Sequence, residues 1–156
     1  MKIKNLIQLK KIVKKLKKEG KKIVFTNGCF DLLHIGHIKC LQEAKKQGDI
    51  LIVGINKDSS VKKIKGKNRP FVKDKERAEI ISSLEMVNYV VLFGETTPFK
   101  VIKELKPDVL VKGKDYKKKE VIGRDIVEKN GGKVVLIPVV KNHSTSLLIK
   151  KIKRYG

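Results

Sequence analysis

Short, continuously apolar runs recur along the chain and alternate with stretches of helical periodicity. The apolar runs lie at Ile23–Thr26, Ile50–Ile55, Tyr89–Phe93, Val109–Val111 and Val134–Ile137. Runs of this kind are typical of strands buried on both faces of a parallel sheet. The intervening segments predict helices at about 36–47, 74–86, 97–105 and 119–130, with a last one near 145–153.

An amphipathic helix is also predicted before the first strand, at residues 5–19. Asn5 can cap its start, Gly20 lies where a helix end is expected, and one face is marked by Leu6, Leu9, Val13 and Leu16. Strands that alternate with helices imply parallel pairing with right-handed crossovers. The fold class is therefore α/β: a single doubly wound, Rossmann-like domain with a five-stranded parallel sheet.

The whole chain, 1–156, has the length of one domain. We expect an N-terminal helix within 1–20 and a catalytic core at 21–150, with Lys63–Asn68 as the main loop. No apolar run approaches the roughly 18 residues of a membrane span, and no signal peptide precedes the first helix. The two cysteines lack metal-site spacing, so a reducing cytoplasm is the expected location, with no membrane partner.

The formal net charge of +22 allows two interpretations. Clustered Lys and Arg can bind nucleic acid or anionic membranes, whereas a lysine-rich surface can instead serve solubility and attract anionic substrates. The lysines recur throughout the chain, and no aromatic residues alternate with them as a stacking platform would require. We therefore favour the second interpretation over a nucleic-acid partner.

In doubly wound folds, ligands bind beyond the carboxyl ends of the strands. Three polar segments directly follow the first, fourth and fifth apolar runs, at Asn27–His37, Lys112–Tyr116 and Lys141–Ser146. These segments are therefore the predicted walls of a binding site.

The first of these segments has the features of a phosphate site. Gly28 permits a turn in which backbone N–H groups are open to a phosphate, and Gly36 removes a side chain that would obstruct it. His34 and His37 lie three residues apart at a predicted helix start, whose N–H groups favour anions. Two metal-ligating histidines are the alternative, but no third ligand has zinc-like spacing.

The segment Gly28–His37, which reads Gly-x-Phe-Asp-x-x-His-x-Gly-His, resembles the signature of the cytidylyltransferase-like nucleotidyltransferases. The resemblance covers roughly residues 21–150. It continues through Gly48–Asn56, Lys65-Gly66, Arg69-Pro70, Glu76–Glu79, Lys106–Gly113 and Ser144–Ser146. Within this family the chain is most similar to the D-glycero-β-D-manno-heptose 1-phosphate adenylyltransferases, which form the second domain of a bifunctional heptose kinase/adenylyltransferase.

That resemblance implies transfer of AMP from ATP to the heptose 1-phosphate, giving ADP-heptose and pyrophosphate by in-line attack on the α-phosphorus. The run Asp108–Tyr116 favours this branch, and Pro138 is followed by Val139 and Val140 where the cytidylyltransferases have an Arg. Cytidylyl transfer to glycerol 3-phosphate or another polyol phosphate is the alternative within the family. A basic nucleic-acid-binding module is the alternative from another class. The phosphate loop of P-loop enzymes, the dinucleotide turn and the nucleophile elbow are missing from the sequence.

The resemblance assigns roles residue by residue. His34, His37 and Lys65 are the expected catalytic residues, with Lys67 or Arg69 as further phosphate ligands. The expected nucleotide-binding residues are Thr26, Asn27, Gly28, Phe30, Gly36, Lys112, Gly113, Asp115, Ser144, Thr145 and Ser146.

Several of these residues have ordinary structural interpretations as well. Asp115 and Tyr116 can form a surface turn, and Ser144 or Thr145 can simply cap a helix. Arg77 matches the family but can form a helix-surface ion pair with Glu76 or Glu79.

The implied cofactor is Mg²⁺, with ATP as substrate, and no protein metal site is expected beyond an indirect Mg²⁺ role for Asp31. A turn-capping Asp is the alternative for that residue. The expected partners are a sugar 1-phosphate, a second copy in a homodimer, and a separate heptose kinase upstream, because no kinase domain precedes the first helix.

Overall fold

The computed structural model describes residues 1–114, 117, 120–138, 140 and 143–155. Five strands form one parallel sheet: β1 (Ile23–Gly28), β2 (Ile50–Asn56), β3 (Tyr89–Phe93), β4 (Val109–Gly113) and β5 (Lys133–Ile137). The helices are α1 (Leu6–Lys18), α2 (Ile35–Lys45), α3 (Asp58–Lys65), α4 (Asp74–Ser82), α5 (Phe99–Leu105), α6 (Arg124–Lys129) and α7 (Thr145–Tyr155). The strand order is β3-β2-β1-β4-β5. The predicted five-stranded doubly wound sheet is confirmed.

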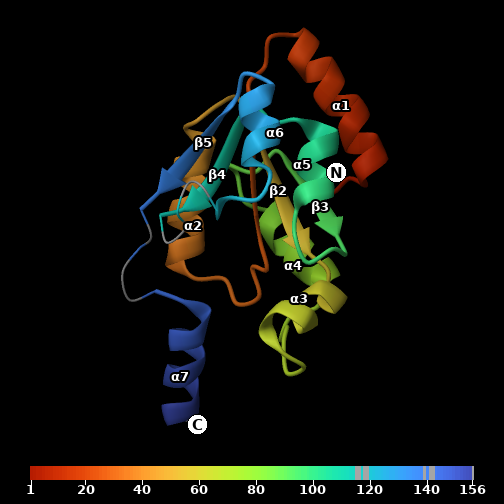
Figure 1. The fold of residues 1–156 in the computed structure, drawn as a ribbon. Coiled ribbons are helices and arrows are strands. Elements are labelled where there is room, and N and C mark those ends of the chain that lie inside the picture. The colour runs from red at the N-terminus through yellow and green to blue at the C-terminus, as the bar shows by residue number, and fades with distance from the viewer. Residues whose placement is uncertain (115–116, 118–119, 139, 141–142, 156) are drawn as a thin grey trace.

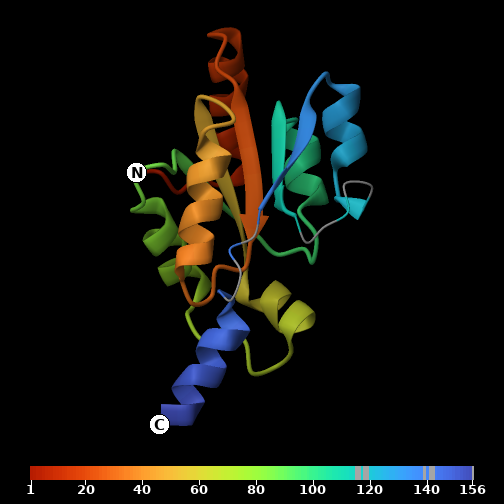
Figure 2. The ribbon, with the colours of Figure 1, turned by 90° about the vertical axis from the view of Figure 1, so that its left-hand side faces the viewer.

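Helices cover both faces of the sheet, as Figures 1 and 2 show. One apolar cluster joins α1, α5 and α6 to the sheet through side chains such as Leu9, Ile102 and Val127. The other joins α2 and α4 to the opposite face through Leu41 and Ile81. Helix α7 projects away from these layers, and none of its described side chains is buried.

The alternation of side chains in β1 explains why the strands are apolar throughout. Ile23 and Phe25 belong to the first apolar cluster, and Val24 between them belongs to the second. All three are fully buried. Successive strand side chains point to opposite faces, so a central strand with helices on both sides needs apolar residues at every position.

The strand order reverses at β1 and β4, and this reversal opens the sheet at its carboxyl edge. From β1 the chain continues outward to β2 and β3, whereas β4 and β5 lie on the other side. Backbone pairing of β1 with β4 covers only Val24–Val109 and Phe25–Leu110. Beyond these pairs the strands separate, which creates the crevice expected at a topological switch point.

Three elements differ from the sequence predictions. The helix predicted at 74–86 ends earlier, because α4 stops at Ser82. Residues 63–65, expected in a loop, belong to α3, a helix that was not predicted at all. Only Ser60 and Val61 of α3 are buried, so its Lys-rich sequence carries no clear apolar stripe. The helix predicted at 119–130 is shorter, because α6 begins only at Arg124. In the described part of the chain, no helix is long and apolar enough to cross a membrane.

We predict that Gly54→Ala lowers the free energy of unfolding by about 1–3 kcal/mol, because the new methyl group overpacks the core. A Cβ at Gly54 would lie 2.8 Å from Cζ of Phe25 and 3.2 Å from Cβ of Asn27. Gly94→Ala is the matched control, since its Cβ would meet only Cδ of Lys57 at 3.8 Å. Urea unfolding of both variants measures the difference. Equal stabilities would contradict this account of the β1–β2 contact.

Candidate functional site

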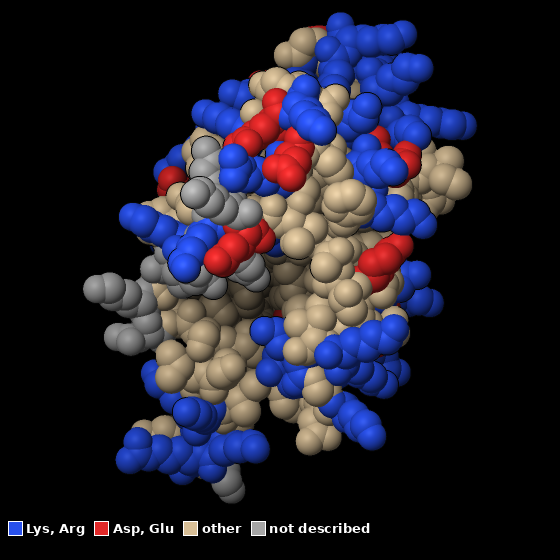
Figure 3. Space-filling view, viewed as in Figure 1, with Lys and Arg blue, Asp and Glu red and all other residues tan. Residues whose placement is uncertain are grey.

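A cavity of about 600 Å³ lies at the carboxyl edge of the sheet, where β1 and β4 separate. All three predicted polar segments line it. The lining residues are Asn27–Asp31, His34, Gly36 and His37 of the first segment, Lys112 and Gly113 of the second, and 143–146 of the third. Ile64 and Lys65 of α3 and the loop 96–98 also line it. Figure 3 shows a hollow on the viewed face, bordered mainly by neutral side chains, with many Lys and Arg side chains and a few acidic ones farther out. The structure therefore brings the three predicted segments together.

The turn after β1 is held in an unusual backbone conformation. Phe30 has a φ of 48°, in the left-handed region that non-glycine residues rarely occupy. Its ring lies over Gly28, where a Cβ would be only 3.1 Å from ring carbon Cε2. The same ring contacts His37, with 5.2 Å between ring centroids. Strained residues of this kind occur where the surrounding structure fixes a functional geometry.

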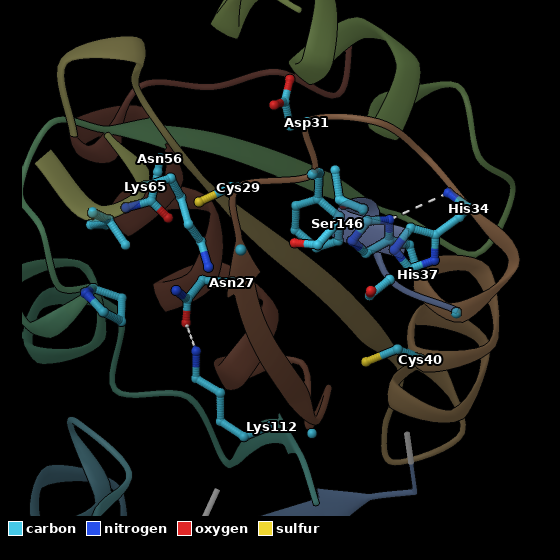
Figure 4. A pocket seen from close by; sticks show the side chains of 18 of the residues that line it. Asn27, Cys29, Asp31, His34, His37, Cys40, Asn56, Lys65, Lys112 and Ser146 are labelled. Carbon is cyan, nitrogen blue, oxygen red and sulfur yellow. Dashed lines mark hydrogen bonds between the residues drawn. The ribbon is translucent and has the colours of Figure 1, made fainter. Parts of the chain in front are cut away.

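The imidazoles of His34 and His37 stack at the N-terminus of α2, with ring centroids 3.8 Å apart and planes 26° apart. Nδ1 of His37 accepts a long hydrogen bond of 3.4 Å from the backbone N–H of His34 (Figure 4). An accepting Nδ1 places the proton of a neutral imidazole on Nε2. His37 can therefore donate a hydrogen bond from Nε2 to an anionic ligand.

Burial keeps both histidines neutral. It lowers the pKa of His37 from 6.5 to about 4, with a smaller contribution from the neighbouring His34. Burial also lowers the pKa of His34, and His143 adds to that effect. A protonated imidazole is disfavoured in this site because it would lose hydration. The site thus presents neutral hydrogen-bond donors in a region that favours negative charge.

Gly36 is required by the histidine pair itself. A Cβ at this position would lie 2.9 Å from Cε1 and Nδ1 of His34 and 3.3 Å from the carbonyl oxygen of His143. The glycine thus lets the His34 ring fold over the first turn of α2. Nδ1 of His34 is buried and has no hydrogen-bond partner among the described residues. A buried nitrogen without a partner lowers stability, which marks a site shaped for function.

Lysine side chains enter the cavity opposite the histidines. Nζ of Lys112, at the end of β4, donates to Oδ1 of Asn27, at the end of β1, and so bridges the two separating strands. Figure 4 shows Lys65, Asn27 and Lys112 on one side of the pocket and the histidine pair on the other. An anion in this cavity would lie between cationic and neutral donors.

The remaining predicted site residues differ in where they lie relative to the cavity. Ser144, Thr145 and Ser146 line the cavity, and Oγ of Ser144 accepts from the backbone N–H of Leu147 at 3.2 Å, which confirms the helix-capping interpretation. Thr26 is buried within β1. Asp115, Tyr116 and Lys141 lie outside the described residues.

Arg77 is not the surface residue that its helical sequence suggested. Its side chain is fully buried, and it donates to the carbonyl oxygens of Cys29, Val72 and Asn56 and to Oδ1 of Asp58. The predicted ion pair with Glu76 or Glu79 is wrong, because the guanidinium turns inward. There it ties together the ends of β1 and β2, the start of α3 and the segment before α4.

The sequence analysis missed a fourth wall of the cavity. Asn56 at the end of β2 and Thr96, Thr97 and Pro98 after β3 also line it. Nδ2 of Asn56 donates to Oγ of Ser60 at 2.9 Å, and that hydroxyl donates to the carbonyl oxygen of Glu95 at 2.7 Å. Both segments directly follow apolar runs. The rule that selected the other three walls would therefore have found them.

The acidic and metal-ligating side chains of the described residues bear on the expected Mg²⁺. They include no group of three or more His, Cys, Asp or Glu side chains placed to bind a metal ion. Asp31, the one carboxylate among the described lining residues, accepts hydrogen bonds from Arg69, Phe71 and Val72. Its indirect Mg²⁺ role stays a prediction. Figure 4 shows this carboxylate pointing away from the histidine pair.

Comparisons with a family model and with individual proteins agree on the family of this chain. The model of the cytidylyltransferase-like family matches residues 25–154. A protein named "Bifunctional protein HldE" is 53% identical over 156 residues in Geobacter metallireducens, with 99% of this chain and 32% of that protein covered. The Helicobacter pylori protein of the same name is 52% identical over 149 residues, with 96% and 31% covered. The chain thus spans about a third of these relatives' length.

Solved structures agree on the fold. A lipopolysaccharide core biosynthesis protein from Thermoplasma volcanium aligns with a TM-score of 0.65 and 33% identity, covering 80% of this chain and 100% of that one. A pantoate-beta-alanine ligase from Francisella tularensis has a TM-score of 0.65 and 21% identity, with 99% of this chain and 79% of that chain covered. The second likeness supports the fold alone.

We predict that the lowered pKa of His37 makes the protein less stable in acid. The imidazole has a pKa of about 4 when folded and 6.5 as its ordinary value, so the unfolded chain binds its proton more readily. The stability that the protein has while His37 is neutral in both the folded and the unfolded state is complete above pH 6.5. It is lost as the pH falls to about 4, because the unfolded chain is protonated first. Between these pH values, the free energy of unfolding should fall by roughly 1–3 kcal/mol more in the wild type than in His37→Gln. Parallel pH profiles from urea unfolding would contradict the neutral, buried state of His37.

Proposed function

Because the chain belongs to the cytidylyltransferase-like family of nucleotidyltransferases, we propose that it transfers AMP from ATP to D-glycero-β-D-manno-heptose 1-phosphate. The products are ADP-heptose and pyrophosphate. The relatives named "Bifunctional protein HldE" and the structural relative titled as a lipopolysaccharide core biosynthesis protein support a sugar-nucleotide product. The motif alone fits several nucleotides and acceptors, so the substrate pair rests on this similarity.

The observation that carries the proposal is the stacked, neutral histidine pair at the start of α2. His37 can donate from Nε2, and the N-terminal N–H groups of the helix favour an anion at the same place. During transfer, negative charge moves from the attacking phosphate toward the leaving pyrophosphate. Fixed donors near that charge stabilise the transition state without reorganising, which is the largest effect available to such a site.

The proposed chemistry is an in-line displacement. A phosphate oxygen of the sugar 1-phosphate attacks the α-phosphorus of ATP, and the bond from that phosphorus to the bridging oxygen of the β-phosphate breaks. The acceptor oxygen is already anionic, so no general base is needed. Positioning and electrostatic stabilisation then supply the catalysis.

The residues around the cavity divide into two groups in this proposal. His34, His37 and Lys65 bind the reacting phosphates, with Arg69 beside them on the same wall as Lys65. The nucleotide lies along Asn27, Gly28, Lys112 and Gly113, toward the start of α7. Mg²⁺ is expected to arrive bound to the phosphates of ATP, as it commonly does when a protein offers few carboxylates.

The origin of the acceptor is a further proposal. A sugar 1-phosphate is made by a kinase, and the relatives named as bifunctional are about three times as long as the part this chain covers. We propose that a kinase activity supplies the substrate and that two copies of this chain form a homodimer.

We predict that pyrophosphate is released in the presence of Mg²⁺ only when ATP and heptose 1-phosphate are both supplied. The assay compares ATP with CTP, and heptose 1-phosphate with glycerol 3-phosphate, in all four pairings. Release only with CTP and glycerol 3-phosphate would keep the family chemistry but overturn both substrates. Silence in all four pairings, followed by a salt-sensitive shift of random-sequence DNA, would favour the nucleic-acid-binding alternative.

We further predict that His37→Ala lowers kcat by about 10²–10³-fold, because a fixed donor to the transition state is lost. The exposed His143, which also lines the cavity, provides a matched comparison, since it lies outside the stacked pair. His143→Ala should have a smaller effect. Circular dichroism and thermal unfolding check that both variants are folded. A folded His37→Ala variant with near-normal turnover would exclude the proposed role.

A further inference from the structure

The segment between α3 and α4 is fastened to the turn after β1 by one buried carboxylate. The Asp31 side chain is 1% exposed. Its Oδ1 accepts from the backbone N–H groups of Phe71 at 2.8 Å and Val72 at 3.0 Å, and its Oδ2 accepts from Nε of Arg69 at 2.6 Å. Three donors satisfy the buried charge, as a carboxylate removed from water requires.

Arg69 is held from two sides. Its Nε binds Asp31, and its guanidinium carbon lies 5.1 Å from the ring centroid of Phe71, at cation–π distance. The Arg69 side chain is 17% exposed and lines the cavity. Since Nε is the atom that binds the carboxylate, the two Nη groups remain as donors toward an anionic ligand.

Arg77 holds the same segment from the other side. Its Nε donates to the carbonyl oxygen of Val72 at 2.9 Å, and its Nη1 donates to the carbonyl oxygen of Cys29. The peptide groups of Val72 are therefore bound to Asp31 through the N–H and to Arg77 through the C=O. The position of Arg69 is fixed relative to the turn that carries His34 and His37.

From this geometry we propose that Asp31 is a positioning residue, which orients Arg69 so that its Nη groups bind the β- and γ-phosphates of the triphosphate. The inference rests on the proposed nucleotidyl transfer, and it replaces a metal role for Asp31 with an action through Arg69. Arginine suits this task because its planar fork can bind a carboxylate at Nε and a phosphate at Nη. A lysine has all three of its donors on one nitrogen, so it lacks the fixed separation between the two binding edges.

Asp31→Asn separates the proposed role from the packing of the segment. The amide oxygen can still accept from Phe71 and Val72, whereas its NH₂ group faces the N–H donor of Arg69 and cannot bind it. We expect the dissociation constant for ATP, measured by calorimetry with Mg²⁺ and no acceptor, to rise about tenfold. AMP lacks the β- and γ-phosphates, so its affinity should change little. An unchanged ATP affinity, or an equal loss for ATP and AMP, would overturn the proposal.

A double-mutant cycle tests whether Asp31 acts through Arg69. Arg69→Gln alone should weaken ATP binding by a similar factor, and adding Asp31→Asn should then cause little further loss. Independent, additive losses would overturn the proposal, as would a change in the Mg²⁺ requirement in Asp31→Asn but not in Arg69→Gln. Asp125→Asn, at an exposed acidic position on α6, is the matched control and should bind ATP normally. Arg69→Gln leaves both backbone donors to Asp31, the N–H groups of Phe71 and Val72, in place, so it remains informative if Asp31→Asn unfolds.

The same titrations are run with CTP and CMP so that two failures can be told apart. Tighter wild-type binding of CTP than ATP would overturn the adenylyl assignment, while the comparison of triphosphate with monophosphate would still test Asp31. A wild type that binds neither triphosphate would overturn both proposals.

Discussion

The buried guanidinium of Arg77 connects the parts of the structure on which the cavity depends. It binds carbonyl oxygens at the ends of β1 and β2, the segment before α4, and the carboxylate of Asp58 at the start of α3. A buried charge left without these partners would be strongly destabilising, so the four segments must be in place together. The ends of two strands and the wall that carries Lys65 thus form one mutually dependent unit.

The electrostatic design of the cavity combines two kinds of donor. Burial holds the stacked histidines neutral, so they hydrogen-bond an anion without adding positive charge of their own. Lys65, Arg69 and Lys112 supply the positive charge from the other walls. In the proposed reaction, neutral donors close to the reacting phosphorus would keep their orientation, whereas the flexible cationic side chains would neutralise a polyphosphate over a wider region.

Much of the fold follows from sequence because the local and overall signals agree. Apolar runs such as Ile50–Ile55 form strands, as predicted. The polar segment Asn27–His37, which follows the first apolar run, lines the cavity. The sequence could not show that Arg77 turns inward, because helical spacing equally allows a surface ion pair. It also could not show α3, whose buried residues are only Ser60 and Val61 and whose Asp58 binds the distant Arg77. Both depend on partners that come together only in the folded chain.

Three carboxylates of this basic chain join segments of the fold. Asp31 and Asp58 bind arginines beside the cavity, and Asp108 at the opposite edge binds the N–H of Ile23 and Nζ of Lys17. Lys and Arg outnumber acidic residues over the viewed face (Figure 3), and in the proposed function this positive field would attract a polyphosphate before the donors of the site bind it. Attraction over long distances and recognition at short range are thereby assigned to different side chains.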